Sequence, residues 1–117
     1  MGMPGRKAIK KNLSKIIKDL EIEFSVINGE NAADDGRGIT KEIAEDLFFQ
    51  GIDVITSGNH IWDKEETTKY IEKEKRLLRP ANLAEGSPGK GFGIFSTKNK
   101  KYKVGVINLM GNVFMRK

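Results

Sequence analysis

Two short polar segments carry the side chains best suited to chemistry. One is Ser57-Gly58-Asn59-His60, which follows the apolar run 54–56 and contains the only histidine among 117 residues. The other is Asn28-Gly29-Glu30-Asn31, which follows the strand-like run 24–27. Both segments therefore lie where a short buried strand is predicted to end.

Parallel strands of an α/β sheet bring the loops that follow them to one crevice, where such folds bind ligands. The side chains expected to converge there are Glu30, Asn31, Asn59 and His60. A carboxylate can bridge two divalent cations, an asparagine oxygen can be a neutral ligand, and an imidazole can transfer a proton. Such groups suit metal-assisted hydrolysis of phosphate esters, in which two metals about 3.5 to 4 Å apart hold the attacking and leaving oxygens. Asn-Gly-Glu-Asn is also an ordinary turn sequence, which is the alternative interpretation.

The first half of the chain predicts helices that alternate with strands. A helix after Pro4-Gly5 carries apolar residues in steps of three and four, followed by a strand at 24–27 and a loop at 30–39. Thr40 is the expected N-cap of the next helix, and Gly51 is the expected end of it. The apolar stripe of the first helix consists of Ile9, Leu13, Ile16, Ile17 and Leu20.

The second half begins with a strand at 53–56 and a helix from Asp63 to Lys75, where Glu66 has the spacing of a capping box. Residues 77–80 indicate a short strand ended by proline. The apolar runs 92–96 and 102–109 flank a polar turn at 98–101, which is a hairpin pattern. The sequence thus predicts an α/β fold, with strand-helix alternation followed by a hairpin, in one domain over residues 1–117.

Composition limits the classes of protein. The chain has no cysteine, which excludes disulfides and thiolate metal sites. No apolar stretch approaches the roughly 20 residues of a membrane span, and the N-terminus lacks the apolar core of a signal peptide. A cytoplasmic protein is therefore expected.

The net charge of +5 is concentrated at the N-terminus. Six cations precede the first acid, Asp19, and the rest of the chain is nearly balanced. A solvated helix face explains this charge, and a non-catalytic module that binds RNA or another anion is the alternative function. The six cations are Arg6, Lys7, Lys10, Lys11, Lys15 and Lys18.

The polar segments resemble those of a known enzyme family. Ser57-Gly58-Asn59-His60 is similar to the Gly-Asn-His signature of calcineurin-like metallophosphoesterases. With the segments 28–31, 38–40, 60–63, 79–82 and 106–111, the chain resembles the YmdB-type bacterial branch over nearly its whole length. The resemblance implies an α/β/β/α sandwich that hydrolyses phosphodiesters, including 2',3'- or 3',5'-cyclic nucleotides, at a dinuclear metal site.

The resemblance also implies roles for four residues. Glu30 would bridge both metals, Asn59 would bind one of them, and Asn31 would be a further ligand or lie beside the site. His60 would be the catalytic histidine, which protonates the leaving oxygen or stabilises the transition state. The implied metal is iron or manganese, with magnesium as an alternative, and the implied substrate is a small phosphodiester.

The chain departs from the family pattern in two places. It begins at the turn Gly2-Met3-Pro4-Gly5-Arg6, whereas the family has a preceding strand that ends in an aspartate ligand. It also has no histidine besides His60 to match ligands from the family's second half. We therefore expect an N-terminal portion of such an enzyme, which holds part of the site and need not be active alone. The missing strand would leave a sheet edge that favours a homo-oligomer.

Several residues have simpler structural interpretations. His60 could cap the following helix, and Glu30 could be a solvent-facing acid. Trp62 is expected to pack against the loop, although an aromatic ring beside a nucleotide site can also stack on a base. Arg79 suits either a phosphate contact or a structural ion pair. Asp34 and Asp35 are expected to be solvated, and Asn82 and Asn108 to hold loop backbones.

Overall fold

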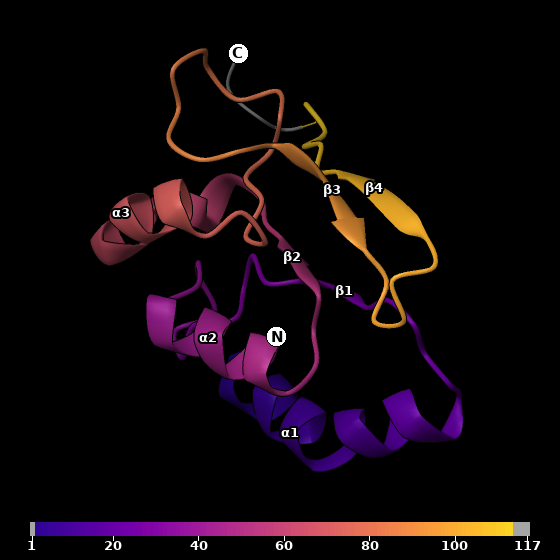
Figure 1. Cartoon of the computed structure of the whole chain (residues 1–117). Helices are drawn as coiled ribbons and strands as arrows, with labels where there is room; N and C mark the ends of the chain where they lie inside the picture. Colours follow the sequence, from indigo (N-terminus) through magenta and orange to yellow (C-terminus); the bar gives the residue numbers. More distant parts are fainter. Residues whose placement is uncertain (1, 114–117) are drawn as a thin grey trace.

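The computed structural model describes residues 2–113 and confirms the α/β class (Figure 1). Helices and strands alternate up to the third helix, and an antiparallel hairpin follows. The elements are α1 (Gly2–Asp19), β1 (Val26–Asn28), α2 (Lys41–Phe49), β2 (Val54–Thr56), the 3-10 helix η1 (Asn59–Trp62), α3 (Glu65–Lys73), β3 (Phe92–Ser96) and β4 (Lys103–Ile107). No helix within residues 2–113 is long and apolar enough to cross a membrane.

The strands β1 and β2 are parallel, and α2 makes the crossover between them. Val26 pairs with Val54 and Asn28 with Thr56, so both strands end at the same level. Thr40 accepts a hydrogen bond at 3.2 Å from the backbone of Ile43 and caps α2, as predicted. After α2 the chain turns at Gly51, whose φ of +109° favours glycine.

The hairpin also follows the prediction. Phe92 pairs with Ile107 and Ser96 with Lys103 across an antiparallel ladder. The hairpin docks on the segment before β1, where the backbone of Lys98 donates to the carbonyl of Glu23 at 3.0 Å. The rings of Phe24 and Phe95 lie 6.2 Å apart at this contact.

One apolar core joins the helices to the sheet. Ile55 of β2 packs in it with Leu47 of α2 and Ile71 of α3. Helix α1 contributes only half-buried side chains, Ile9 and Leu13, and has no fully buried residue. The predicted stripe is therefore too wide, because Leu20 is 69% exposed and Ile16 is 44% exposed.

Three predicted helix boundaries and one predicted cap are wrong. Helix α1 begins at Gly2 and includes Pro4, which a first helical turn tolerates because its missing N–H needs no partner. Helix α3 begins at Glu65 without a side-chain cap and ends at Lys73. The capping box is absent, since Glu66 accepts from the backbone of Lys41 at 3.2 Å.

The last correction concerns the strand predicted at residues 77–80. This segment forms only isolated bridges, Leu77 with Ile55 and Leu78 with Lys90. The backbone N–H of Leu78 donates to Ile55 at 2.8 Å, and that of Arg79 to Lys90 at 3.0 Å. The segment therefore links β2 to the start of the hairpin without being a regular strand.

Candidate functional site

The two polar segments meet where β1 and β2 end. The carboxyl group of Glu30 lies directly over Gly58, so a Cβ atom added at Gly58 would overlap it and lie only 2.5 Å from its Oε2. Gly58 is buried and precedes η1, which begins with Asn59 and His60. The parallel pairing thus brings a carboxylate from one segment against the backbone of the other.

The backbone of Glu30 is held on both sides. Its N–H donates to the Asn28 side chain at 3.0 Å, and its carbonyl accepts from the N–H of Gly38 at 2.7 Å. Gly29 extends the ladder by donating to Thr56 at 2.8 Å. Only glycine fits there, because a Cβ would lie 2.7 Å from Ile55 Cγ2. These contacts fix where the Glu30 side chain leaves the loop.

His60 is held by the aspartate three residues further on. Its Nδ1 lies 2.8 Å from Asp63 Oδ2, and both side chains are partly exposed. A carboxylate only accepts hydrogen bonds, so Nδ1 carries the hydrogen and Nε2 is left for chemistry. The sequence analysis missed this role of Asp63, which it assigned to a helix cap. The available signal was the spacing of three residues, which brings side chains together on one turn.

The two asparagines are placed differently from Glu30. Asn59 opens η1 and Asn31 follows Glu30, and both are exposed. The backbone of Asn31 bridges to Gly38, and its carbonyl accepts from Gly2 at 2.6 Å. Within residues 2–113 neither side chain forms a hydrogen bond. Both amide oxygens are therefore available as uncharged metal ligands.

A buried amide ties the hairpin to this region. The Asn108 side chain donates to the carbonyls of Ser57 at 2.9 Å and Leu78 at 3.0 Å. Ser57 Oγ also donates to Leu78 at 2.7 Å. Asn82 exchanges two hydrogen bonds with the backbone of Met110. The prediction that Asn82 and Asn108 hold loop backbones is confirmed.

The side chains near Glu30 do not complete a dinuclear centre. Residues 2–113 contain no group of three or more histidine, cysteine, aspartate or glutamate side chains that could hold a metal ion. The three predicted ligands, Glu30, Asn31 and Asn59, offer one carboxylate and two amide oxygens. Such hard oxygen donors suit a cation like Mg²⁺ or Mn²⁺ that keeps several waters. They are too few for two metals.

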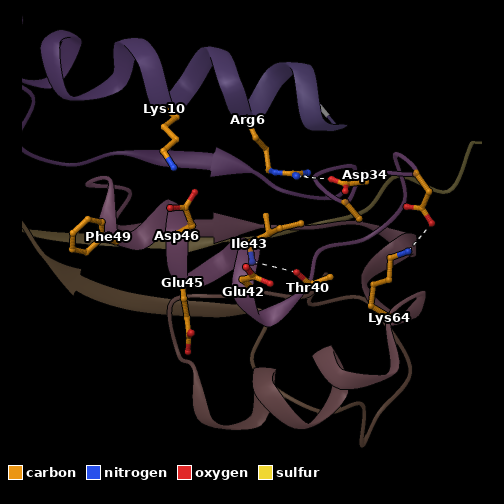
Figure 2. A pocket seen from close by; sticks show the side chains of 12 residues that line it. Arg6, Lys10, Asp34, Thr40, Glu42, Ile43, Glu45, Asp46, Phe49 and Lys64 are labelled. Atoms are coloured by element: carbon orange, nitrogen blue, oxygen red, sulfur yellow. Dashed lines mark hydrogen bonds and ion pairs between the residues drawn. The ribbon is translucent and has the colours of Figure 1, made fainter.

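A cavity of the described residues lies apart from these two segments. It occupies about 1030 Å³ between α1 and α2, and Figure 2 shows its lining. Arg6 binds Asp34 at 2.5 Å on one side, and Lys64 binds Asp35 at 2.6 Å on the other. The ion pair with Lys64 lowers the pKa of the Asp35 carboxyl group. None of the four predicted site residues lines this cavity, and its mixed charges are largely paired.

Two other residues have structural roles. Arg79 donates to the carbonyls of Pro88 at 3.1 Å and Pro80 at 2.9 Å, so it binds backbone carbonyls and makes no ion pair within the described residues. Trp62 is half-buried and packs against the core, as expected.

Known structures share this architecture. A hypothetical protein from Thermus thermophilus superposes with a TM-score of 0.89 at 32% identity, covering 100% of this chain and 44% of that one. A novel phosphatase from Mycoplasma pneumoniae superposes with a TM-score of 0.81 at 31% identity, covering 94% of this chain and 40% of that one. The fold is therefore one that a phosphatase uses.

Sequence similarity leads to the same class of protein. The chain is 43% identical over 115 residues to the 2',3'-cyclic-nucleotide 2'-phosphodiesterase of Bacillus subtilis (strain 168). The match covers 98% of this chain and 42% of that protein. A family model described as YmdB-like protein matches residues 1–117, and the chain belongs to this family. It spans less than half the length of the relatives that it matches.

Proposed function

We propose that the Glu30 and His60 segments form part of a metal-dependent phosphodiesterase site. The observation that carries the proposal is the Glu30 carboxylate over Gly58, two residues before a histidine whose Nδ1 is held by Asp63. Phosphate ester hydrolysis needs a cation that neutralises charge and a group that transfers a proton; a carboxylate can hold the cation, and an oriented imidazole can transfer the proton. The similarity to a cyclic-nucleotide phosphodiesterase supports the same substrate class.

Each residue has a distinct role in this proposal. Glu30 would hold a divalent cation, and the amide oxygens of Asn59 and Asn31 would add neutral ligands. When bound, the metal supplies positive charge that neutralises the phosphate. In its imidazolium form His60 would donate the proton on Nε2 to the leaving oxygen, while Asp63 accepts from Nδ1, orients the ring and stabilises its positive charge. A complete site also needs donors beyond these, and the implied metals are iron or manganese.

The first test is Mn²⁺-dependent hydrolysis of bis(p-nitrophenyl) phosphate and of a 2',3'-cyclic nucleotide by the purified chain. We expect His60→Ala to abolish turnover and Asp63→Asn to lower it by about 10- to 100-fold, a typical cost of losing a group that orients a histidine. Glu72→Gln, an exposed change on α3, is the control and should leave turnover unchanged.

A measurement of Mn²⁺ binding distinguishes a chain that holds part of the metal site from a chain that holds none of it. Mn²⁺ titration followed by electron paramagnetic resonance should show binding that Glu30→Gln weakens and Glu72→Gln does not. The proposal would be disproved for this chain if wild-type turnover were no higher than that of His60→Ala and Mn²⁺ binding were unaffected by Glu30→Gln. Binding without turnover would show that this chain holds metal donors but lacks a working site.

The alternative function, anion or RNA binding by α1, has less support. Two of its six cations are already paired, Arg6 with Asp34 and Lys15 with Asp19. If α1 bound RNA, replacing Lys7 and Lys11 with glutamate would weaken binding and flatten its salt dependence. The same change should leave Mn²⁺-dependent hydrolysis unaffected.

A further inference from the structure

Two adjacent aspartates attach the loop of residues 32–38 to two different elements. Asp34 accepts from Arg6 of α1 at 2.5 Å, and Asp35 accepts from Lys64, which directly precedes α3, at 2.6 Å (Figure 2). The sequence predicted that both carboxylates are solvated, and both side chains are more than half exposed. Each of them nevertheless has a cationic partner from a distant part of the chain. The loop is therefore held between the first turns of α1 and the start of α3.

The same loop contacts both segments of the candidate site through Gly38. Its N–H donates to the carbonyl of Glu30 at 2.7 Å. A Cβ added at Gly38 would lie 2.7 Å from the carbonyl oxygen of His60, and the φ of +72° also favours glycine. No hydrogen bond joins Gly38 to His60 within residues 2–113. Such a contact limits how closely the two segments approach, and its weak dispersion attraction does little to keep them together.

The ion pair between Asp35 and Lys64 supplies the missing attraction. Lys64 directly follows Asp63, whose carboxylate lies 2.8 Å from the imidazole of the site. The Cγ atom of Lys64 lies 3.5 Å from the position of a Cβ at Gly38, so the lysine stem passes over the point of contact. The second carboxyl oxygen of Asp35 accepts from the backbone N–H of Arg37 at 3.1 Å, which fixes the carboxylate in the loop. Opposite charges therefore pull the loop and the turn that carries the histidine together beside Gly38.

We propose that Asp35 and Lys64 are positioning residues of the candidate site, whose ion pair keeps Glu30 and His60 at a fixed separation. The inference rests on the proposed phosphodiesterase function. Neither side chain touches the metal or the substrate in this proposal. Asp35 acts through the loop that holds the Glu30 backbone, and Lys64 acts through the residue that holds His60. Catalysis depends on such placement, because an error of about 1 Å can lower turnover about 100-fold.

Amide hydrogen exchange of the metal-free chain measures whether the pair holds the two segments together. The reporters are the N–H of Gly38 and that of Asp63, which donates to the carbonyl of His60 at 3.1 Å. Asp35→Lys and Lys64→Glu should each accelerate the exchange of both amides about fivefold, the size expected of a partly exposed ion pair. The double variant restores opposite charges at the two positions, so both exchange rates should return to those of the wild type.

Asp34→Lys is the matched control, because Asp34 is similarly exposed in the same loop but pairs with α1. This variant should leave the exchange of the Asp63 amide unchanged. Equal acceleration in Asp34→Lys and Asp35→Lys would overturn the proposal, because the Asp63 amide would then respond to any change in the loop. A double variant that exchanges as fast as the single variants would also overturn it.

Mn²⁺ affinity, measured by electron paramagnetic resonance, connects the pair to the site. Lys64→Glu should lower the affinity by up to about 10-fold, and the double variant should restore it. Charge alone predicts the opposite, because an added carboxylate attracts a cation. Stronger Mn²⁺ binding by Lys64→Glu would therefore overturn the positioning role. Absence of Mn²⁺ binding in the wild type would disprove the proposed function, while the exchange rates would still decide whether the pair holds the two segments together.

Discussion

The contact between Glu30 and Gly58 is possible because glycine has no side chain. The carboxyl group occupies the space where any other residue at position 58 would place its Cβ. Gly58 has φ of −140°, so its backbone does not itself require glycine. The steric role of Gly58 is therefore to let a carboxylate approach the backbone that leads into Asn59 and His60.

Gly58→Ala tests this steric role. The added methyl should displace the Glu30 carboxyl group, which can move because it is the end of a flexible side chain, so the fold should survive. We expect Mn²⁺ affinity to fall about 10-fold or more with a change in unfolding free energy below about 1 kcal/mol. Gly111→Ala is the control, because a Cβ there meets no atom within 4 Å. Unchanged Mn²⁺ affinity in Gly58→Ala would contradict a ligand role for Glu30.

At the scale of elements, the turn after α3 is held by a local ion pair. Arg76 donates to both carboxyl oxygens of Glu74, at 2.9 and 2.8 Å, and its guanidinium lies 4.0 Å from the centre of the Phe48 ring. These hydrogen bonds are the main cause of the lowered pKa of Glu74. Arg76 thereby connects the end of α3 to the end of α2.

The lowered pKa of Glu74 makes its contribution depend on pH. Folding favours the ionised carboxyl group, so the stabilisation is present above the ordinary pKa of 4.5 and is lost as the pH falls through the lower folded value. We expect Glu74→Gln to reduce the free energy of unfolding by about 0.5 to 1 kcal/mol at pH 7, because the pair is partly screened by solvent.

Urea unfolding at pH 7 and pH 3 measures this effect. The difference between Glu74→Gln and the wild type should shrink at pH 3. The control Glu72→Gln, which removes an exposed acid from the same helix, should show little difference at either pH. An equal loss at both pH values in Glu74→Gln would contradict an ionic origin.

Elements defined by local chemistry were predictable from sequence. Thr40 and Gly51 delimit α2 because a side-chain cap and a positive φ act within a few residues. Asp63 and Glu66 misled the prediction because the same side chains form other contacts, with His60 and with the backbone of Lys41. The strand predicted at residues 77–80 was wrong because the extent of pairing depends on Ile55 and Lys90, which are distant in sequence and meet this segment only in isolated bridges.

For the candidate site, the sequence predicted which segments converge but not the contacts between them. The position of Glu30 and His60 after two apolar runs indicated convergence, because parallel strands end at one edge. The approach of Glu30 to Gly58 and the partner of His60 required the tertiary structure.

At the scale of the whole molecule, the hairpin and the candidate site are connected through one buried amide. Asn108 follows β4 and donates to Ser57, directly before Gly58, and to Leu78. Its own backbone pairs with Gly91 and Ala81. The position of the Gly58 loop therefore depends on an element about 50 residues later in the chain.

Asn108→Ala should destabilise the Gly58 loop and η1, although Asn108 lies outside the two site segments. The loss of two buried hydrogen bonds should cost about 1 to 3 kcal/mol of unfolding free energy. Hydrogen exchange should accelerate at the amides of η1, where Ile61 donates to the Gly58 carbonyl at 3.2 Å. Asn82→Ala, which removes an amide held by Met110 outside this connection, is the matched control and should leave exchange in η1 unchanged. Faster exchange at η1 in Asn108→Ala but not in Asn82→Ala would show that Asn108 holds the Gly58 loop. Equal acceleration in both variants would contradict this role and show that η1 responds to global stability.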